Sequence, residues 1–337
     1  MGSLEGQRAQ DIEELTPGAP TSAKEAIQAR AISVDKLRES CVLRDGRSLV
    51  DVVVALFCFV AVPVVYATWS NPAVFVACLL LVIRNANSLA QVVHESDHGG
   101  LFRNSRLNLW VGNLAALMLG YTRSGHRNAH MDHHLYLNTE RDPDRIFGSP
   151  NQTGREILFS LIQDLFFVTA IKRLLQYSPS DSGPSSVSPW KGAGVRRFML
   201  NTSTRMLPVV AAQSTILLLF TVTTGPWSYL WLHLVPLMTL YPVQIRIRSA
   251  AEHGTEAGAA ESGTDTWLTR SGQLNLLERL IIAPMDQHYH YEHHLFPGIP
   301  NYNLPRVHGE LVAAGIPVPT HRSYIGFVIR KVQEDLR

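Results

Sequence analysis

Four apolar stretches alternate with polar segments along the chain. The first two, residues 49–69 and 72–93, are separated by the short turn at Ser70 and Asn71, and the other two, 206–225 and 227–247, by an equally short, uncharged turn at Pro226. A helix needs roughly 20 apolar residues to cross a hydrocarbon core of ~30 Å. The pattern therefore predicts an all-α integral membrane protein with four transmembrane helices in two hairpins.

The polar segments predict the rest of the organisation. Residues 1–44 form a polar, largely disordered N-terminal segment: residues 1–30 are rich in Glu, Gln, Ala, Pro and Ser, which is typical of disorder, and one short amphipathic helix is expected near residues 33–42. They lack an apolar run behind a basic start, so no cleaved signal peptide is expected. Residues 45–337 form one membrane domain, whose segments 94–205 and 248–337 are expected to build a helical cap.

Two further apolar segments are less suited to crossing a membrane. Residues 107–121 are too few to span it and predict a re-entrant or interfacial helix. Residues 156–175 carry Gln163, Asp164, Lys172 and Arg173 within an apolar face, which predicts one amphipathic helix lying on the membrane.

Composition agrees with a membrane protein. Charged residues make up 17% of the chain, against roughly 25% in a typical soluble domain. The net charge of +2 and the absence of a basic, aromatic-rich patch argue against a nucleic-acid partner. The three cysteines form no CxxC pair, so neither a disulfide framework nor a thiolate metal site is indicated.

Basic residues give an orientation. Most of them lie before the first apolar stretch, throughout residues 103–205, and at the end of the last stretch, at Arg246 and Arg248. Positive charge stays on the cytoplasmic side of a membrane. The cap is therefore expected on the cytoplasmic face and the two short turns on the opposite face.

Histidines provide the candidate chemistry. Most of the 14 fall into clusters with helical spacing, while one stands alone after the fourth apolar stretch: a pair at 94 and 98, triplets at 130, 133, 134 and at 290, 293, 294, and the single His253. Residues three and four apart share one face of a helix. Each cluster therefore points its imidazoles at one place.

The number of imidazoles exceeds what one metal ion takes. A structural zinc site closes at four ligands and usually includes cysteine, whereas eight or nine nitrogens suit two ions with four or five each. Imidazole binds Zn, Cu, Fe and Ni, so the ligand type leaves the metal open. A membrane-adjacent pair of ions held by nitrogen alone is suited to redox chemistry with O2.

The HxxxH, HxxHH, HxxHH series placed around two membrane hairpins resembles the membrane fatty acid desaturase/hydroxylase superfamily. The segment YHYEHHLFPGIPNYNLPRVH (289–308) is similar to that family's third histidine box, and HHLYLNTERDPD (133–144) to its second. The resemblance covers roughly residues 45–325. It implies a di-iron centre, with two Fe ions, that activates O2 and attacks an unactivated C–H bond.

The same resemblance implies a ligand set and its supporting residues. The implied metal ligands are His94, His98, His130, His133, His134, His253, His290, His293 and His294. Metal-bound imidazoles usually donate their other N–H to a carboxylate or carbonyl. The expected supporting residues are His126, Asp97, Asp142, Asp144 and Glu252, with Glu95 and Glu292 as further nearby acids.

The other histidines receive smaller roles. His288 lies off the face of its triplet and is expected at the surface or beside the ligands. His233, inside the fourth apolar stretch, is expected to be hydrogen-bonded in the bundle or to line a substrate channel. His308 and His321 show no spacing with a partner and are read as ordinary.

The sequence therefore predicts an O2-dependent membrane oxidoreductase that desaturates an aliphatic substrate, either a fatty acyl chain or a natural product. The AAEHG segment (250–254) resembles the branch that contains rhizobitoxine-type desaturases. Hydroxylation on the same scaffold and a metal-binding membrane protein without turnover are the alternatives. The chain has no HPGG-type haem motif, so electrons are expected from an external cytochrome b5 or ferredoxin. The membrane is expected to be the endoplasmic reticulum in a eukaryote or the inner membrane in a bacterium.

Overall fold

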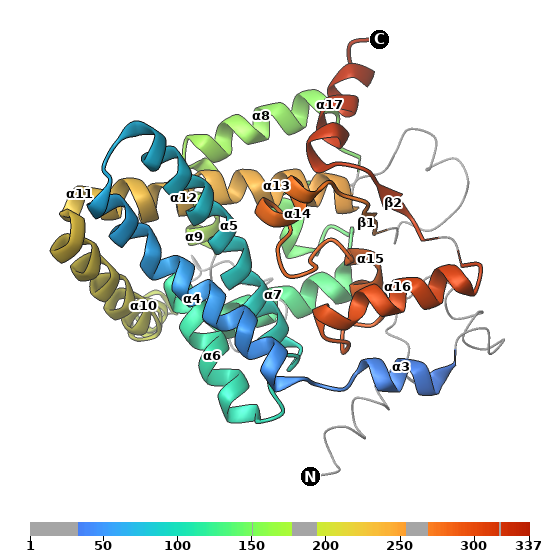
Figure 1. The fold of residues 1–337 in the computed structure, drawn as a ribbon. Coiled ribbons are helices and arrows are strands. Elements are labelled where there is room, and N and C mark those ends of the chain that lie inside the picture. Colours follow the sequence, from blue (N-terminus) through green and yellow to red (C-terminus); the bar gives the residue numbers. More distant parts are fainter. Residues whose placement is uncertain (1–32, 150, 177–193, 254–268, 317) are drawn as a thin grey trace.

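The structure, a computed structural model, describes residues 33–149, 151–176, 194–253, 269–316 and 318–337 (Figure 1). The disorder expected for residues 1–30 lies outside these ranges. The short helix expected after it is confirmed as α3 (Val34–Ser40).

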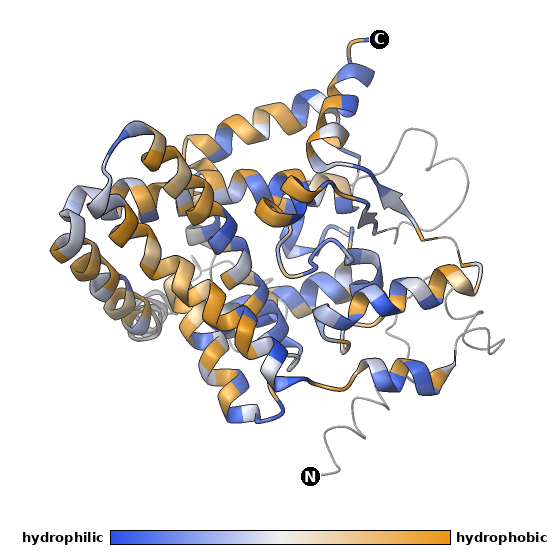
Figure 2. Cartoon of the chain, viewed as in Figure 1, coloured by the Kyte–Doolittle hydropathy of each residue, from blue (hydrophilic) through white to orange (hydrophobic). Residues whose placement is uncertain are grey.

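Three helices of the described residues are long and apolar enough to cross a membrane: α4 (Asp45–Thr68), α5 (Pro72–Asp97) and the part Met206–Thr224 of α10 (Gly194–Thr224). Figure 2 shows long hydrophobic runs along these helices. The turn between α4 and α5 is the expected one: the Asn71 side chain caps α5 by accepting from the Val74 N–H at 3.0 Å, and Pro72 fills the first helical position. The chain is a membrane protein.

The fourth apolar stretch is not one helix. It consists of α11 (Pro226–Tyr229), the π-helical turn η2 (Leu230–Leu234), α12 (Val235–Met238) and α13 (Leu240–His253). Proline has no backbone N–H and removes a helical hydrogen bond, and this stretch contains Pro236 and Pro242. The described residues therefore contain three candidate spans where the sequence predicts four, and this fourth stretch is not among them as a single long helix.

Helix α6 (Ser105–Met118) follows α5 and packs against its end. It has 14 residues, too few to span a membrane, as the sequence predicts. Gly112 permits the close contact, because a Cβ at this position would lie 2.1 Å from the Ser96 Oγ. Asn108 adds a hydrogen bond between the two helices by donating to the Ser96 carbonyl at 2.9 Å. The end of α5, which carries the first two histidines, is thereby held in place.

The first part of the cap contains α7 (Arg123–Tyr136), the 3-10 helix η1 (Pro143–Ile146), α8 (Gly154–Leu165) and α9 (Val168–Gln176). The single amphipathic helix expected over 156–175 is wrong, since the chain breaks at Phe167, whose φ is 64°. Asp164 explains the break. It is fully buried and forms an ion pair with Arg246 of α13 instead of joining an exposed polar face.

The second part of the cap contains α14 (Leu276–Ile281), α15 (His290–Leu295), the 3-10 helix η4 (Asn301–Asn303), α16 (Leu304–Ala313) and α17 (Tyr324–Glu334). Two-residue strands, β1 (Ser271–Gly272) and β2 (Thr320–His321), pair in parallel. Helix α3 lies beside α16 (Figure 1), where Lys36 pairs with Glu310 at 2.7 Å. Leu37 joins Tyr291 and Leu295 in one buried cluster, so α3 supports the helix that carries the third histidine triplet.

Candidate metal centre

Four elements bring the nine predicted histidines together. Helix α5 ends with one pair, α7 and α15 carry one triplet each, and α13 ends with the single residue. The side chains form two groups in which the ligand atoms all lie within 4.8 Å of one another: His94, His98, His130, His134 and His293 in the first, and His133, His253, His290 and His294 in the second.

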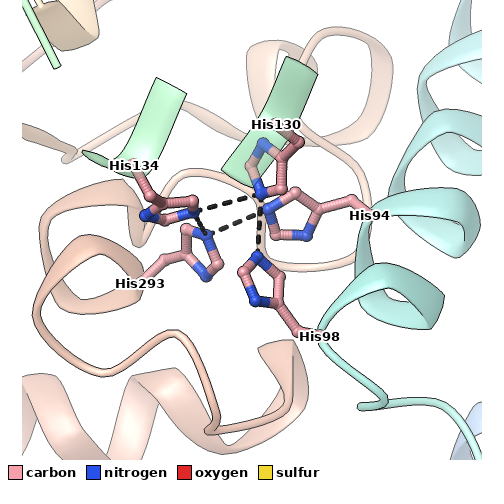
Figure 3. Close-up of side chains that lie close together, drawn as sticks. All are labelled: His94, His98, His130, His134 and His293. Atoms are coloured by element: carbon pink, nitrogen blue, oxygen red, sulfur yellow. Dashed lines mark hydrogen bonds between the residues drawn. The ribbon is translucent and has the colours of Figure 1, made fainter. Parts of the chain in front are cut away.

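Figure 3 shows the five-histidine group, with the rings pointing inward from α5, α7 and α15. The Nε2 of His130 lies 2.8 Å from that of His98 and 3.1 Å from that of His134. The Nε2 of His293 lies 3.0 Å from that of His94 and 3.1 Å from that of His134. All five Nε2 atoms are therefore linked by contacts of similar length.

The four-histidine group repeats this arrangement from α7, α13 and α15. The Nε2 of His290 lies 2.9 Å from that of His253 and 3.1 Å from that of His294. The ring of His133 stands 5.0 Å from the ring of His253, centroid to centroid. The triplet on α7 is therefore split: His130 and His134 face one group, and His133 faces the other.

Hydrogen bonding alone does not account for these contacts, whereas a metal ion does. A ring nitrogen carries either one hydrogen or one lone pair, so the His130 Nε2 cannot form two full hydrogen bonds to two other ring nitrogens. Two imidazole nitrogens bound at right angles to one ion, each at about 2.1 Å, lie about 3.0 Å apart. The donor set and its spacing therefore fit one ion in each group.

Burial keeps most of these rings neutral. Loss of water contact, reinforced by the neighbouring imidazoles, lowers the pKa of His98, His130, His134, His290, His293 and His294 well below the usual value. Burial lowers the pKa of His253 to about 3. A neutral ring offers the lone pair that a metal needs, so the interior favours binding over protonation.

His133 differs from these seven. Burial lowers its pKa, but the hydrogen bond to Asp142 and the negative charge of Asp144 outweigh burial and raise the pKa overall. The Asp142 carboxylate lies 2.9 Å from the His133 Nδ1, and that of Asp144 lies 3.7 Å away. Asp142 also accepts from the backbone N–H of Asn138 and Asp144. The structure places Asp142 where it orients this ring, while Asp144 lies nearby but beyond hydrogen-bond distance.

The other predicted supporting residues occupy different positions. Glu252 lies 3.8 Å from the His290 Nδ1, but its closer partners are Arg248 and the Tyr324 hydroxyl, which donates at 2.6 Å. Asp97 contacts His126 at 2.7 Å and Arg123 at 3.3 Å. His126 belongs to neither of the two histidine groups, and its ring stacks on that of His130 with the ring centroids 5.7 Å apart.

Sequence reasoning ranked Glu95 below Asp97, yet Glu95 contacts a ring of the five-histidine group. One carboxylate oxygen of Glu95 lies 3.3 Å from the His94 Nδ1, and the other accepts from the Asn301 backbone N–H at 3.1 Å. Glu95 thus links the first histidine pair to the turn that follows the third triplet. The sequence signal for this contact was the LFPGIPN segment (295–301). Its turn follows the third triplet directly, so it has to lie close to the metal site.

Two histidines outside the groups, His308 and His288, also differ from expectation. His308 has a partner: its Nδ1 lies 2.5 Å from the fully buried carboxylate of Glu292. Glu292 therefore contacts His308 of α16 and accepts from the Ser271 hydroxyl instead of contacting a ring in either group. His288 is 4% exposed, so a surface position is wrong, and His321 is 2% exposed. His233 is hydrogen-bonded in the bundle, as expected, to Gln213 at 3.2 Å.

A cleft of about 170 Å³ opens beside both groups. Rings from each group line it, together with Tyr121 and Tyr241 and the polar side chains of Gln91 and Gln287. Both groups can therefore act on one molecule bound in the cleft.

Comparison with known proteins identifies one protein family that matches this chain. The fatty acid desaturase family model matches residues 67–323. The chain is 29% identical to dihydrorhizobitoxine desaturase of Bradyrhizobium elkanii over 67% of its length, and 27% identical to the chloroplastic omega-3 fatty acid desaturase of Ricinus communis over 72%. The human (Homo sapiens) sphingolipid delta(4)-desaturase/C4-monooxygenase DES2 is 27% identical over 74% of the chain and 69% of its own length. The matched regions cover 64% and 56% of the first two relatives.

Proposed function

The chain belongs to the fatty acid desaturase family and is a desaturase/hydroxylase-type enzyme of the membrane, and from this premise we propose that it desaturates an aliphatic substrate with O2 at a di-iron centre. The observation that carries the proposal is the pair of histidine groups, five and four imidazoles facing one cleft. Nine imidazole nitrogens in two sets suit two ions of ordinary coordination number.

Iron is the metal that we propose for both groups. Bound there, two ferrous ions supply the binding and reduction of O2 that removal of hydrogen from an unactivated carbon requires. The nine residues that would hold them are the same nine that the sequence suggests. Glu95 and Asp142 hold the outer nitrogens of His94 and His133 and so fix which ring nitrogen faces inward.

The protein's own part in the reaction is to bind and position the substrate. The cleft lies against both groups, so a carbon held in it is close to each. His133 and His293 are buried and the other seven rings are partly buried, which limits the contact of bulk water with the inner nitrogens. Exclusion of water protects reactive species from side reactions, which favours oxidation of the bound chain over loss of oxidant to solvent.

Desaturation is the preferred outcome, and hydroxylation is the second candidate. Each of the relatives named above is a desaturase, but one is also named a C4-monooxygenase. Both outcomes begin with removal of one hydrogen atom from carbon and need the same histidines. Analysis of the products decides between them, since one gives an alkene and the other an alcohol.

We further propose that the cap faces the cytoplasm and receives electrons there from an external cytochrome b5 or ferredoxin. The proposal rests on the basic residues that flank the candidate spans. The broken segment α11–α13 then brings the chain back to the cap as a fourth crossing. Thiol labelling tests this: Asn71→Cys should react only with reagent on the non-cytoplasmic side, and Glu334→Cys only after permeabilisation. The reverse pattern would contradict the orientation.

The test of the activity uses purified protein supplied with ferrous iron, O2, a reductase system and a panel of acyl and small functionalised substrates. A new double bond, together with about two ions per chain by metal analysis, is the expected result. A protein that binds zinc or copper fully, holds no iron, consumes no O2 and forms no product under these conditions would instead be a metal-binding membrane protein without turnover.

A further inference from the structure

A small cavity lies inside the helix bundle, apart from the cleft described above. Its volume is about 20 Å³, enough for one water-sized group. Its walls are apolar except at Asn85 and His233. Polar side chains within membrane spans are costly and tend to be functional. Two of them at one cavity of this size therefore need an explanation.

Asn85 lies on α5 and is 3% exposed. Its Oδ1 is buried and has no hydrogen-bond partner among the described residues. A buried polar group without a partner is destabilising, because it has lost its hydrogen bonds to water and gained none in the protein. The position is therefore suited to a group that arrives from outside the protein.

His233 also lines this cavity, and its hydrogen bond to Gln213 fixes the roles of its two ring nitrogens. The Gln213 amide donates to the carbonyls of Leu117 and Met118, at 2.9 and 3.2 Å, so its Oε1 is the atom that faces His233. This oxygen can only accept, which assigns the hydrogen of His233 to Nε2. The Nδ1 of the neutral ring is then left with a lone pair.

The backbone at His233 is also unusual. The residue lies in the π-helical turn Leu230–Leu234. Single π-helical turns inside helices are rare and frequently mark functional sites. Tyr229 strengthens the arrangement, because its hydroxyl donates to the same Gln213 oxygen at 3.0 Å and helps to fix the amide.

The cavity and the cleft have no lining residue in common, but nearby residues of the same segments line both. Leu89, Leu119 and Leu237 line the cavity, while Ala90, Tyr121 and Tyr241 line the cleft. Along α5, Asn85 precedes His94 by nine positions, a rise of about 13 Å. An aliphatic chain that lies along α5 from the histidines thus reaches the cavity, once the side chains between the two spaces give way.

We propose that this cavity binds a hydroxyl group carried by the substrate, roughly 13 Å from the carbon that is oxidised. The proposal rests on the proposed function and specifies its substrate class: an aliphatic chain with an uncharged polar end. A hydroxyl donates one hydrogen and accepts others, which matches the acceptors of Asn85 and His233 and the Asn85 amide N–H. A charged amine or carboxylate would be much more costly to bury at this depth.

The experiment compares two probes of matched length, a fatty acid with a terminal hydroxyl and one with a terminal methyl, over a series of chain lengths. Binding to the purified full chain is measured without O2 or reductant, from the shift in thermal unfolding with probe concentration. The wild type should bind the hydroxyl-terminated probe on the order of tenfold more tightly at one chain length.

Asn85→Leu should abolish this preference, while the protein without probe should be as stable as the wild type or more so, because the unpaired amide is gone. The control is Thr215→Val, which removes a hydroxyl from an exposed face of α10 where it bonds only to the Ala211 carbonyl. This variant should keep the preference.

Two results would overturn the proposal. Equal binding of both probes by the wild type would mean that the cavity holds a buried water only, and an unchanged preference in Asn85→Leu would place recognition elsewhere. The proposed function fails separately: a protein that prefers the hydroxyl probe but oxidises no substrate supports the cavity and contradicts the activity.

Discussion

The two histidine groups share a pattern but differ in their surroundings. In the group of four, His133 is held by the Asp142 carboxylate at 2.9 Å. In the group of five, the carboxylate contact from Glu95 to His94 is longer, 3.3 Å, and the same oxygen also accepts from Gln91 at 3.0 Å. The group with fewer nitrogens thus has the more strongly oriented ring. A six-coordinate ion would have two coordination positions left for other ligands in the group of four and one in the group of five.

This difference suggests a division of roles between the groups. More open positions suit the group of four to exchange of small ligands, while five nitrogens suit a more closed site. Removal of single residues from each group tests how far the two depend on one another.

The largest expected effect comes from loss of one inner imidazole. His293→Ala in the group of five and His294→Ala in the group of four should each reduce turnover to background, because one coordination position is lost outright. Metal analysis should show about one ion per chain in place of two. His308→Ala is the control and should keep both ions and part of the activity. If it were as inactive as His293→Ala, the division between ligands and other histidines would be wrong.

Removal of the supporting carboxylate should reduce activity or metal affinity more in the group of four than in the group of five. Asp142→Asn should lower activity or metal affinity by about 10- to 100-fold, because second-sphere partners of metal-bound histidine typically contribute this much. Glu95→Gln should cost less, since its contact to His94 is longer and shared. Metal titration followed by turnover measures both. Equal losses of activity or metal affinity in the two variants would contradict the proposed difference between the groups.

His126→Ala should have a smaller effect than Asp142→Asn, about tenfold at most. Its Nδ1 contacts Asp97, and its ring stacks on that of His130 without entering either group. The variant should therefore retain both ions while turnover falls. Loss of one ion would instead show that His126 is a ligand.

The smallest effect concerns the support of α15 by α16. The hydrogen bond to Glu292 raises the pKa of His308 above 6.5. Because the folded-state pKa is the higher one, the pair stabilises the protein at low pH, and this contribution is lost as pH rises through the raised pKa. Melting temperatures from about pH 6 to about pH 9 should fall more in the wild type than in His308→Gln, by a few degrees or less. Parallel curves would show that the pair contributes nothing measurable.

Much of this molecule follows from its sequence. Apolar runs long enough to span a hydrocarbon core predict α4, α5 and the apolar part of α10, and the Asn71-Pro72 pair predicts where α5 begins. Histidines three and four residues apart must share a helix face, so the clusters on α5, α7 and α15 were predictable as units. Local periodicity is sufficient for these features because they depend only on helix geometry.

Only the tertiary structure decided how these units meet. It divides the α7 triplet between the two groups, pairs the buried Asp164 with Arg246 where an amphipathic face was expected, and gives His308 a partner sixteen residues away in Glu292. It also breaks the fourth apolar stretch at a π-helical turn beside Asn85 and His233. Each of these depends on contacts between distant segments, and the spacing of residues along one helix carries no information about which neighbour its other faces will meet.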